Sequence, residues 1–148
     1  MAPRNAWAMI TAIDTNVFIA LWDKDPALSG AAQTALDSAF SRGRLVVAAP
    51  VFAELIAAPG RTESFVSSFL EETGVAVDWD LGEPVWRSAG RAFQSDAERR
   101  RKQRDTGARR ILADFLIGAH AYTRSYQLLT LDERLYRAAF PTLRLETV

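Results

Sequence analysis

The sequence has no cysteine, only one histidine and no long apolar run, and each shortage narrows the classes of protein it can encode. The absence of cysteine excludes a disulfide scaffold and any metal site with thiolate ligands, and it fits a reducing compartment. The apolar segment Ala6–Ile13 is much shorter than the ~20 residues that cross a bilayer, and no cleavage-site pattern follows it. We therefore expect a soluble, cytoplasmic protein with no membrane partner.

Charge of neither sign prevails. The 148 residues include 18 Lys plus Arg and 18 Asp plus Glu, so the formal net charge is zero and only the distribution of charge can indicate a partner. Hydrophobic residues make up 49% of the chain, close to the globular average, which argues against disorder. The length suits one domain over residues 1–148, large enough to bury a core without disulfides.

Short apolar runs of strand length alternate with segments whose apolar residues recur at helical spacing. We expect strands at Met9–Ile13, Leu45–Ala49, Val75–Trp79, Gln127–Leu131 and Leu143–Thr147. We expect helices at Val17–Trp22, Leu28–Arg42, Pro50 to about Pro59, Thr62–Glu72, Glu83–Arg101, Ile111–Thr123 and Glu133–Ala139. The Glu83–Arg101 helix carries Val85, Trp86, Ala89, Ala92 and Phe93 on one side. This alternation predicts an α/β fold in which a parallel sheet has helices on both faces.

Asp14 and Asp132 each stand directly after a predicted strand. In open parallel sheets, ligands bind in the crevice beyond the carboxyl ends of the strands, so both carboxylates are candidates for a binding site. Each also has a structural interpretation, because Asp is a favoured N-cap residue for a helix that follows. Thr130 is a competing N-cap candidate for the second of these helices.

Glu54 and Asp114 lie within predicted helices. Glu54 adjoins the apolar stripe of a helix that follows the second strand, where an acid could instead stabilise the first turn through the helix dipole. Asp114 is the only Asp, Glu, Lys or Arg in the apolar segment 111–121, and burying it without a partner would be costly. That partner is either a metal ion or one of the cations Arg109 and Arg110.

These four acids are expected to meet at one edge of the sheet, and together they indicate a metal site. Converging carboxylates raise each other's pKa unless a cation neutralises them. Oxygen ligands without cysteine suit a hard ion such as Mg²⁺ or Mn²⁺. Such an ion lowers the pKa of a bound water and stabilises charge on a phosphoryl oxygen. The residues therefore predict metal-dependent phosphodiester or phosphoester chemistry.

Four motifs follow one another along the chain: Ile13–Val17, Val51–Leu55, Ala113–Ala121 and Leu128–Asp132. In their order and spacing they resemble the PIN domain, and the resemblance covers nearly the whole chain. The short length without an appended domain resembles the VapC toxins of bacterial toxin–antitoxin pairs.

The resemblance implies a three-layer α/β/α sandwich with a central parallel sheet and endoribonuclease activity dependent on Mg²⁺ or Mn²⁺. By motif position, the metal-binding and catalytic acids would be Asp14, Glu54, Asp114 and Asp132. Three supporting residues, Thr15, Asn16 and Thr130, would orient a carboxylate or a water by hydrogen bonds. The resemblance further implies an RNA substrate, a cognate antitoxin and a homodimer.

A basic segment precedes the third motif. Its cations are Arg99, Arg100, Arg101, Lys102, Arg104, Arg109 and Arg110. Charge runs are usually solvated surface, but carboxylates alone repel RNA, and a basic patch beside them would supply phosphate contacts. We therefore favour RNA binding for this segment.

The remaining conspicuous side chains are interpreted as structural. His120 comes six residues after Asp114, on a different face of the helix, and is expected to pack or to form a hydrogen bond. The four tryptophans are expected in the core or at an interface: Trp7, Trp22, Trp79 and Trp86. The stripe of Phe65, Val66, Phe69 and Leu70 is expected in the core or in a groove for the antitoxin.

Three alternatives compete with the nuclease. A metal-dependent phosphatase of the haloacid dehalogenase type also has an Asp after its first strand, but it normally has a second acid two residues later, where this chain has Asn16. A phosphorelay receiver needs a lysine near its end, whereas the only lysines are Lys24 and Lys102. A catalytically silent PIN module that only binds a partner is disfavoured by the four intact acids.

Overall fold

A computed structural model describes residues 9–104 and 111–148 of the chain. Its centre is a five-stranded sheet with the order β3-β2-β1-β4-β5, in which every neighbouring pair is parallel. The strands are β1 (Thr11–Ile13), β2 (Leu45–Ala48), β3 (Val75–Asp78), β4 (Gln127–Thr130) and β5 (Leu145–Thr147). The predicted parallel sheet is confirmed.

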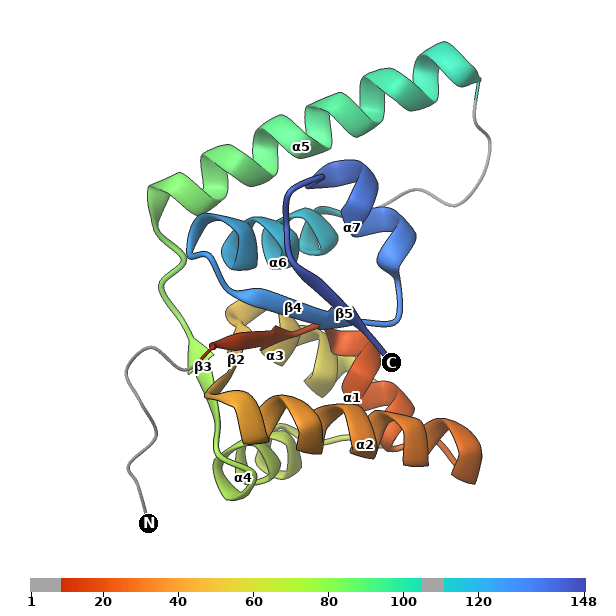
Figure 1. Cartoon of the computed structure of the whole chain (residues 1–148), viewed down its shortest axis with the longest axis vertical. Coiled ribbons are helices and arrows are strands. Elements are labelled where there is room, and N and C mark those ends of the chain that lie inside the picture. Colours follow the sequence, from red (N-terminus) through yellow and green to blue (C-terminus); the bar gives the residue numbers. More distant parts are fainter. Residues whose placement is uncertain (1–8, 105–110) are drawn as a thin grey trace.

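Helices cover both faces of the sheet (Figure 1). One layer contains α1 (Thr15–Leu21), α2 (Pro26–Arg42), α3 (Ala49–Ala57) and α4 (Glu63–Glu72). The other contains α5 (Gly82–Gln103), α6 (Leu112–Thr123) and α7 (Glu133–Ala139). Right-handed crossovers explain this division, because the chain moves outward in one direction from β1 to β3 and in the other direction after β3. The predicted α/β/α sandwich is therefore confirmed.

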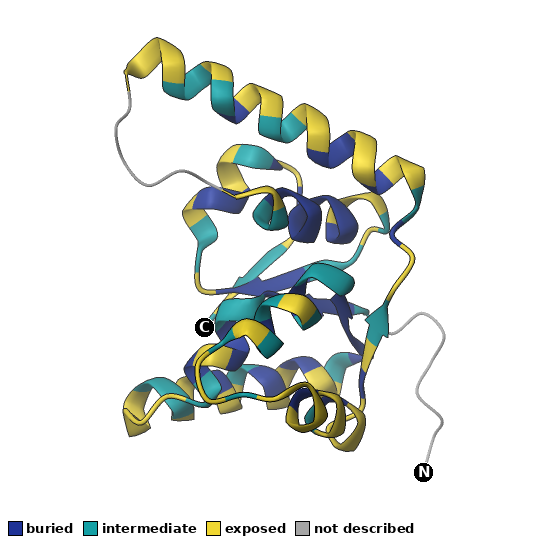
Figure 2. Ribbon diagram, turned by 180° about the vertical axis from the view of Figure 1, so that it is seen from behind, coloured by how far each residue is buried: buried dark blue, intermediate teal, exposed yellow. Residues whose placement is uncertain are grey.

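The core lies between the sheet and the facing sides of both helix layers (Figure 2). Strands β1, β2 and β4 are almost wholly buried, whereas the helices keep exposed outer faces. The sheet is therefore covered on both faces, which explains why its strands read as continuous apolar runs and not as alternating patterns.

Several helix and strand boundaries differ from the predicted ones for identifiable reasons. Helix α2 begins at Pro26, because Asp25 is its N-cap and accepts a hydrogen bond from Ala27 N at 3.0 Å. Strand β5 begins two residues later than predicted, because Leu143 N bonds to Phe140 O at 3.0 Å in a turn. These are local hydrogen-bond choices that apolar periodicity does not reveal.

Two of the four tryptophans, all expected in the core or at an interface, do not lie in the core. Trp86 is 52% exposed and Trp79 is 63% exposed. On α5, Val85 and Ala89 are fully buried, and Trp86 is rotated by ~100° from Val85, which turns it away from the buried face of the helix. Trp22 does pack, in edge-to-face contact with Phe69 at 5.1 Å between ring centroids. Trp7 lies outside the described residues.

Candidate functional site

Successive strands are added on one side of the central strand β1 up to β3, and on its other side from β4 onward. Strand β2 follows β1 through α1 and α2 in one layer, whereas β4 follows β3 through α5 and α6 in the other layer. In open parallel sheets, ligands bind beyond the carboxyl ends of the strands at such a switch point, which here lies between β1 and β4. Asp14 directly follows β1, and Asp132 comes two residues after β4. Glu54 is on α3, which follows β2, and Asp114 is in the first turn of α6. The four predicted acids therefore belong to elements that border the same edge.

The Asp14 carboxylate is held by the side chain of Thr130, the last residue of β4. It is only 5% exposed, and its carboxylate Oδ2 accepts a hydrogen bond from Thr130 Oγ1 at 2.8 Å. Although Asp14 occupies the N-cap position of α1, its side chain makes no capping hydrogen bond. The N-cap interpretation of the Asp14 carboxylate is therefore wrong, and its position is set by tertiary structure.

The N-cap interpretation holds for Asp132. Its Oδ1 accepts a hydrogen bond from Leu135 N at 3.2 Å, which caps α7. Its own backbone N donates to Thr130 Oγ1 at 2.9 Å. Thr130 thus receives a hydrogen bond from Asp132 and donates one to Asp14, so the hydroxyl couples the turn after β4 to the end of β1.

Thr15 and Asn16 form two further cross-links at this edge. Thr15 Oγ1 donates to Glu54 Oε1 at 2.6 Å, which ties α1 to α3. Asn16 Oδ1 accepts from Leu131 N at 3.2 Å, which ties α1 to the turn after β4. Glu54 lies beyond the first turn of α3, so the helix-dipole interpretation of this acid is wrong.

Asp114 approaches Asp14 closely enough for their charges to interact. Its Oδ2 accepts a hydrogen bond from Ile111 N at 3.2 Å at the start of α6. Burial, the largest cause, and the charge of Asp114 raise the pKa of Asp14 from 3.8 to about 6, against the opposing hydrogen bond from Thr130. The proposed cationic partners Arg109 and Arg110 lie outside the described residues.

Tyr136 on α7 is a member of this edge that the sequence did not single out. Its side chain is fully buried, and its hydroxyl makes no hydrogen bond of ordinary geometry with any described residue. The hydroxyl nevertheless lies close enough to Asp14 to lower the pKa of that carboxyl. A buried hydroxyl without a partner is unusual in a folded protein and points to a ligand, water or ion at the same place.

The described side chains have the donor chemistry of a site for a hard cation, but they do not enclose one as they stand. Within residues 9–104 and 111–148, no group of three or more His, Cys, Asp or Glu side chains is arranged to hold a metal ion. The donors at the edge are all oxygens, as Mg²⁺ and Mn²⁺ prefer. The raised pKa of Asp14 and the unpartnered hydroxyl of Tyr136 are both features that a bound cation or its waters would relieve.

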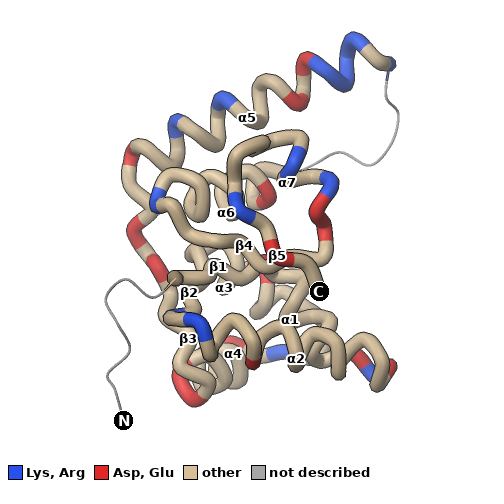
Figure 3. Tube along the Cα trace, viewed as in Figure 1, with Lys and Arg blue, Asp and Glu red and all other residues tan. Residues whose placement is uncertain are grey.

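The basic segment occupies the end of α5. Figure 3 shows Lys and Arg gathered there, and this end extends clear of the other helices. Arg99 is paired with Asp96 at 2.8 Å, whereas Arg101, Lys102 and Arg104 are exposed. Of the predicted RNA-binding residues, Arg109 and Arg110 fall outside the described part of the chain.

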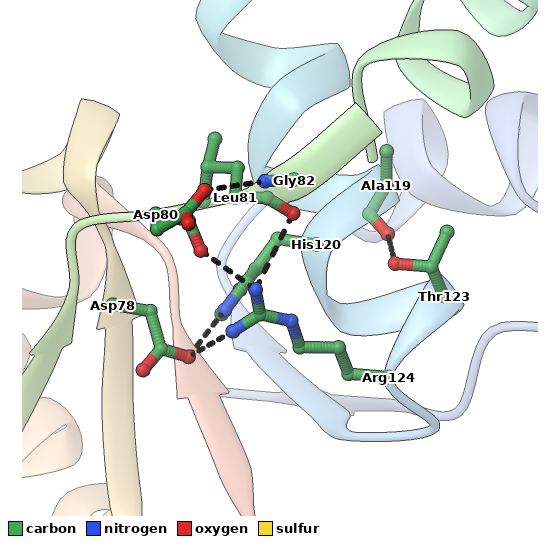
Figure 4. Close-up of polar contacts among 8 residues, drawn as sticks. All are labelled: Asp78, Asp80, Leu81, Gly82, Ala119, His120, Thr123 and Arg124. Carbon is green, nitrogen blue, oxygen red and sulfur yellow. Dashed lines mark hydrogen bonds and ion pairs between the residues drawn. The ribbon is translucent and has the colours of Figure 1, made fainter. Parts of the chain in front are cut away.

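His120 takes part in a separate network at the other end of α6 (Figure 4). Its ring is fully buried, and its Nε2 lies 2.8 Å from Asp78 Oδ2. Arg124 donates to the same oxygen at 2.9 Å and to the carbonyl of Asp80 at 2.8 Å. The expected hydrogen-bonding role of His120 is confirmed, and the network fastens the start of α5 to the end of α6.

No helix in the described part of the chain is long and apolar enough to cross a membrane. No curated protein matches the sequence.

The fold resembles solved structures of VapBC proteins. VapBC2 from Rickettsia felis bound to a promoter DNA fragment is 19% identical with a TM-score of 0.65, covering 94% of this chain and 98% of that chain. VapBC-1 from nontypeable Haemophilus influenzae is 21% identical with a TM-score of 0.64. DNA-bound VapBC from Salmonella typhimurium is 19% identical with a TM-score of 0.58, and both alignments cover 94% of this chain and 98% of the other chain. The family model described as PIN domain matches residues 11–141. The chain therefore belongs to the PIN domain family.

Proposed function

We propose that this protein is a metal-dependent endoribonuclease and the toxin of a VapBC-type pair. The observation that carries the proposal is the placement of Asp14, buried at the switch point of the sheet, held by Thr130 and facing the charge of Asp114. A carboxylate in that position is costly to ionise unless a cation shares the site. Membership of the PIN family and the likeness to VapBC complexes support the nuclease and the antitoxin partner.

In the proposed mechanism, Mg²⁺ or Mn²⁺ would be held by Asp14, Glu54, Asp114 and Asp132. When bound, the ion stabilises charge on the phosphoryl oxygens and activates water for attack on the phosphodiester. Thr130 orients the Asp14 carboxylate, and Thr15 orients Glu54. Asn16 fixes the turn that carries Asp132 by accepting from Leu131 N.

The substrate of the proposed enzyme is RNA, bound in part by the basic end of α5. The exposed cations Arg101, Lys102 and Arg104 would contact phosphates, which the acids alone would repel. A cognate antitoxin, a homodimeric state and a cytoplasmic location complete the proposal.

The test is RNA cleavage by purified protein free of antitoxin, with Mg²⁺, with Mn²⁺ and with EDTA, beside the Asp14→Asn variant. Asp37→Asn is the matched control, because Asp37 is an exposed acid on the outer face of α2. Cleavage that requires metal, disappears in Asp14→Asn and persists in Asp37→Asn supports the proposal. Equal cleavage by all three proteins would identify a contaminant or a wrong site, and metal-dependent capture of RNA or antitoxin without cleavage would favour a silent binding module.

A further inference from the structure

Tyr136 carries a hydroxyl that the core of the protein does not need. Among the described residues it is the largest of the fully buried side chains. Its hydroxyl makes no hydrogen bond of ordinary geometry with any of residues 9–104 and 111–148. Burying a hydroxyl without a partner is unfavourable, and phenylalanine would fill the same space without this cost. The hydroxyl is therefore better explained by the adjoining site than by packing.

Backbone spacing places Tyr136 between two of the proposed ligands. On α6, Gly118 follows Asp114 by four residues, so both lie on one face of the helix. Tyr136 packs against that face, because an added Cβ at Gly118 would lie 3.1 Å from Tyr136 Cδ1. On α7, Tyr136 follows the N-cap Asp132 by four residues, so the two residues lie on the same face of that helix.

The position of the ring is fixed tightly. An added Cβ at Gly118 would also clash with Cε2 of Phe140 and force a shift of its ring. Glycine at this position therefore lets α6 approach α7 until the Tyr136 ring fills the space between them. Such close packing leaves the hydroxyl little freedom to seek another partner.

Electrostatics agree with this placement. Burial is the largest cause that raises the pKa of Tyr136, and the charges of Asp14, Asp114 and Asp132 raise it further. The hydroxyl thus stays protonated at any ordinary pH and can act as a hydrogen-bond donor to a carboxylate.

We propose that Tyr136 is a positioning residue whose hydroxyl donates to the Asp14 carboxylate when the site holds a divalent ion, as a second donor beside Thr130. The inference rests on the proposed metal-dependent function. Hydrogen bonds to ligating carboxylates orient them for the metal, and their loss weakens metal binding. In the metal-free protein the same hydroxyl already lies close enough to lower the pKa of Asp14, although it makes no hydrogen bond of ordinary geometry.

Tyr136→Phe tests this assignment by two measurements on the folded protein. Titration calorimetry with Mn²⁺ should give a Kd weaker by on the order of tenfold or more, the usual effect of losing such a hydrogen bond. The melting temperature in EDTA should stay close to that of the wild type, because the hydroxyl makes no hydrogen bond of ordinary geometry in the metal-free protein. Tyr122→Phe is the matched control, since Tyr122 is 45% exposed on α6, and neither quantity should change.

Three outcomes would overturn the assignment. An unchanged Mn²⁺ Kd in Tyr136→Phe, with the wild type binding Mn²⁺, would remove Tyr136 from the site and leave the proposed nuclease intact. A lower melting temperature in EDTA with unchanged Mn²⁺ binding would show that the hydroxyl serves packing. Absence of Mn²⁺ binding by the wild type would overturn the metal-dependent function together with the role of Tyr136.

Discussion

Thr130 Oγ1 donates to Asp14 Oδ2 across 2.8 Å and joins residues 116 positions apart in the sequence. Both side chains are buried, and the same hydroxyl accepts from the backbone N of Asp132. One hydroxyl therefore orders the two sides of the switch point at once. Removal of the Thr130 hydroxyl should therefore lower the free energy of unfolding and also disturb the position of the Asp14 carboxylate.

Replacement of Thr130 by valine preserves the shape of the side chain and removes the hydroxyl. The Asp14 carboxylate and the Asp132 N–H both lose a partner, so we expect a loss of about 1–3 kcal/mol in the free energy of unfolding. Cleavage should fall by on the order of tenfold to a hundredfold. Denaturant unfolding and RNA cleavage measure the two effects, and Thr130→Ser should restore both. Full activity in Thr130→Val would contradict the proposed role.

The raised pKa of Asp14 predicts how stability depends on pH without metal. The folded protein binds this proton more tightly than the unfolded chain does, because the pKa rises from 3.8 to about 6. The stabilising contribution of protonated Asp14 is fully present below pH 3.8 and is lost as the pH rises through 6. A rise of about two units in the pKa of Asp14 means that its ionised carboxylate lowers the free energy of unfolding by about 3 kcal/mol at neutral pH.

Asp14→Asn should therefore increase the stability of the metal-free protein at pH 7.5 while it abolishes cleavage. Denaturant unfolding in EDTA at pH 7.5 and pH 5 provides the measurement, and the difference between variant and wild type should shrink at pH 5. Mg²⁺ should stabilise only the wild type. A variant less stable than the wild type at pH 7.5 in EDTA would refute the strain assigned to Asp14.

His120 should produce a pH dependence of opposite sign. Burial, the largest cause, lowers the pKa of His120 below 6.5, against the attraction of Asp78 and with a smaller contribution from Arg124. The unfolded chain thus binds this proton more tightly, so stability is complete above pH 6.5 and is lost as the pH falls. Unfolding measured in the Asp14→Asn background isolates this effect, and adding His120→Gln should flatten the curve. An unchanged slope would exclude His120 as its source.

Much of this architecture follows from local sequence. The apolar runs locate the strands, and their alternation with helices predicts the parallel sheet. Asp14, Glu54, Asp114 and Asp132 are conspicuous because each interrupts or ends an apolar element. The choice between capping and tertiary contact for Asp14 could not be made locally, since it depends on Thr130, far along the chain.

The residues that the sequence analysis missed can be recognised only when each is considered together with a second residue. Tyr136 resembles any apolar position of a short helix until its spacing from Asp132 is considered with that of Gly118 from Asp114. Asp78 and Arg124 stand 46 positions apart, and no period connects them. Trp86 does not reach the core because Val85 and Ala89 define the buried stripe of α5 and Trp86 lies at its margin.

Two glycines on helices should respond oppositely to alanine. Gly118→Ala places a Cβ against the rings of Phe140 and Tyr136, so it should cost about 1–3 kcal/mol through overpacking. Gly90 on α5 has nothing within 4 Å of an added Cβ, so Gly90→Ala should stabilise by up to about 1 kcal/mol through helix propensity. Thermal or denaturant unfolding of both variants gives the comparison, and equal effects would contradict the close packing of α6 on α7.

The basic end of α5 should bind RNA through phosphate charge. Arg101→Ala, measured in the inactive Asp14→Asn background, should weaken RNA binding and reduce the slope of log affinity against log salt by about one, as expected for one lost phosphate contact. Arg87→Ala is the matched control, because Arg87 lies on the same helix far from this end and is paired with Glu83 at 2.9 Å. Fluorescence anisotropy over a range of salt concentrations resolves the two. If both variants changed the slope equally, binding would reflect the charge of α5 as a whole, and the end of the helix would have no special part in holding the substrate.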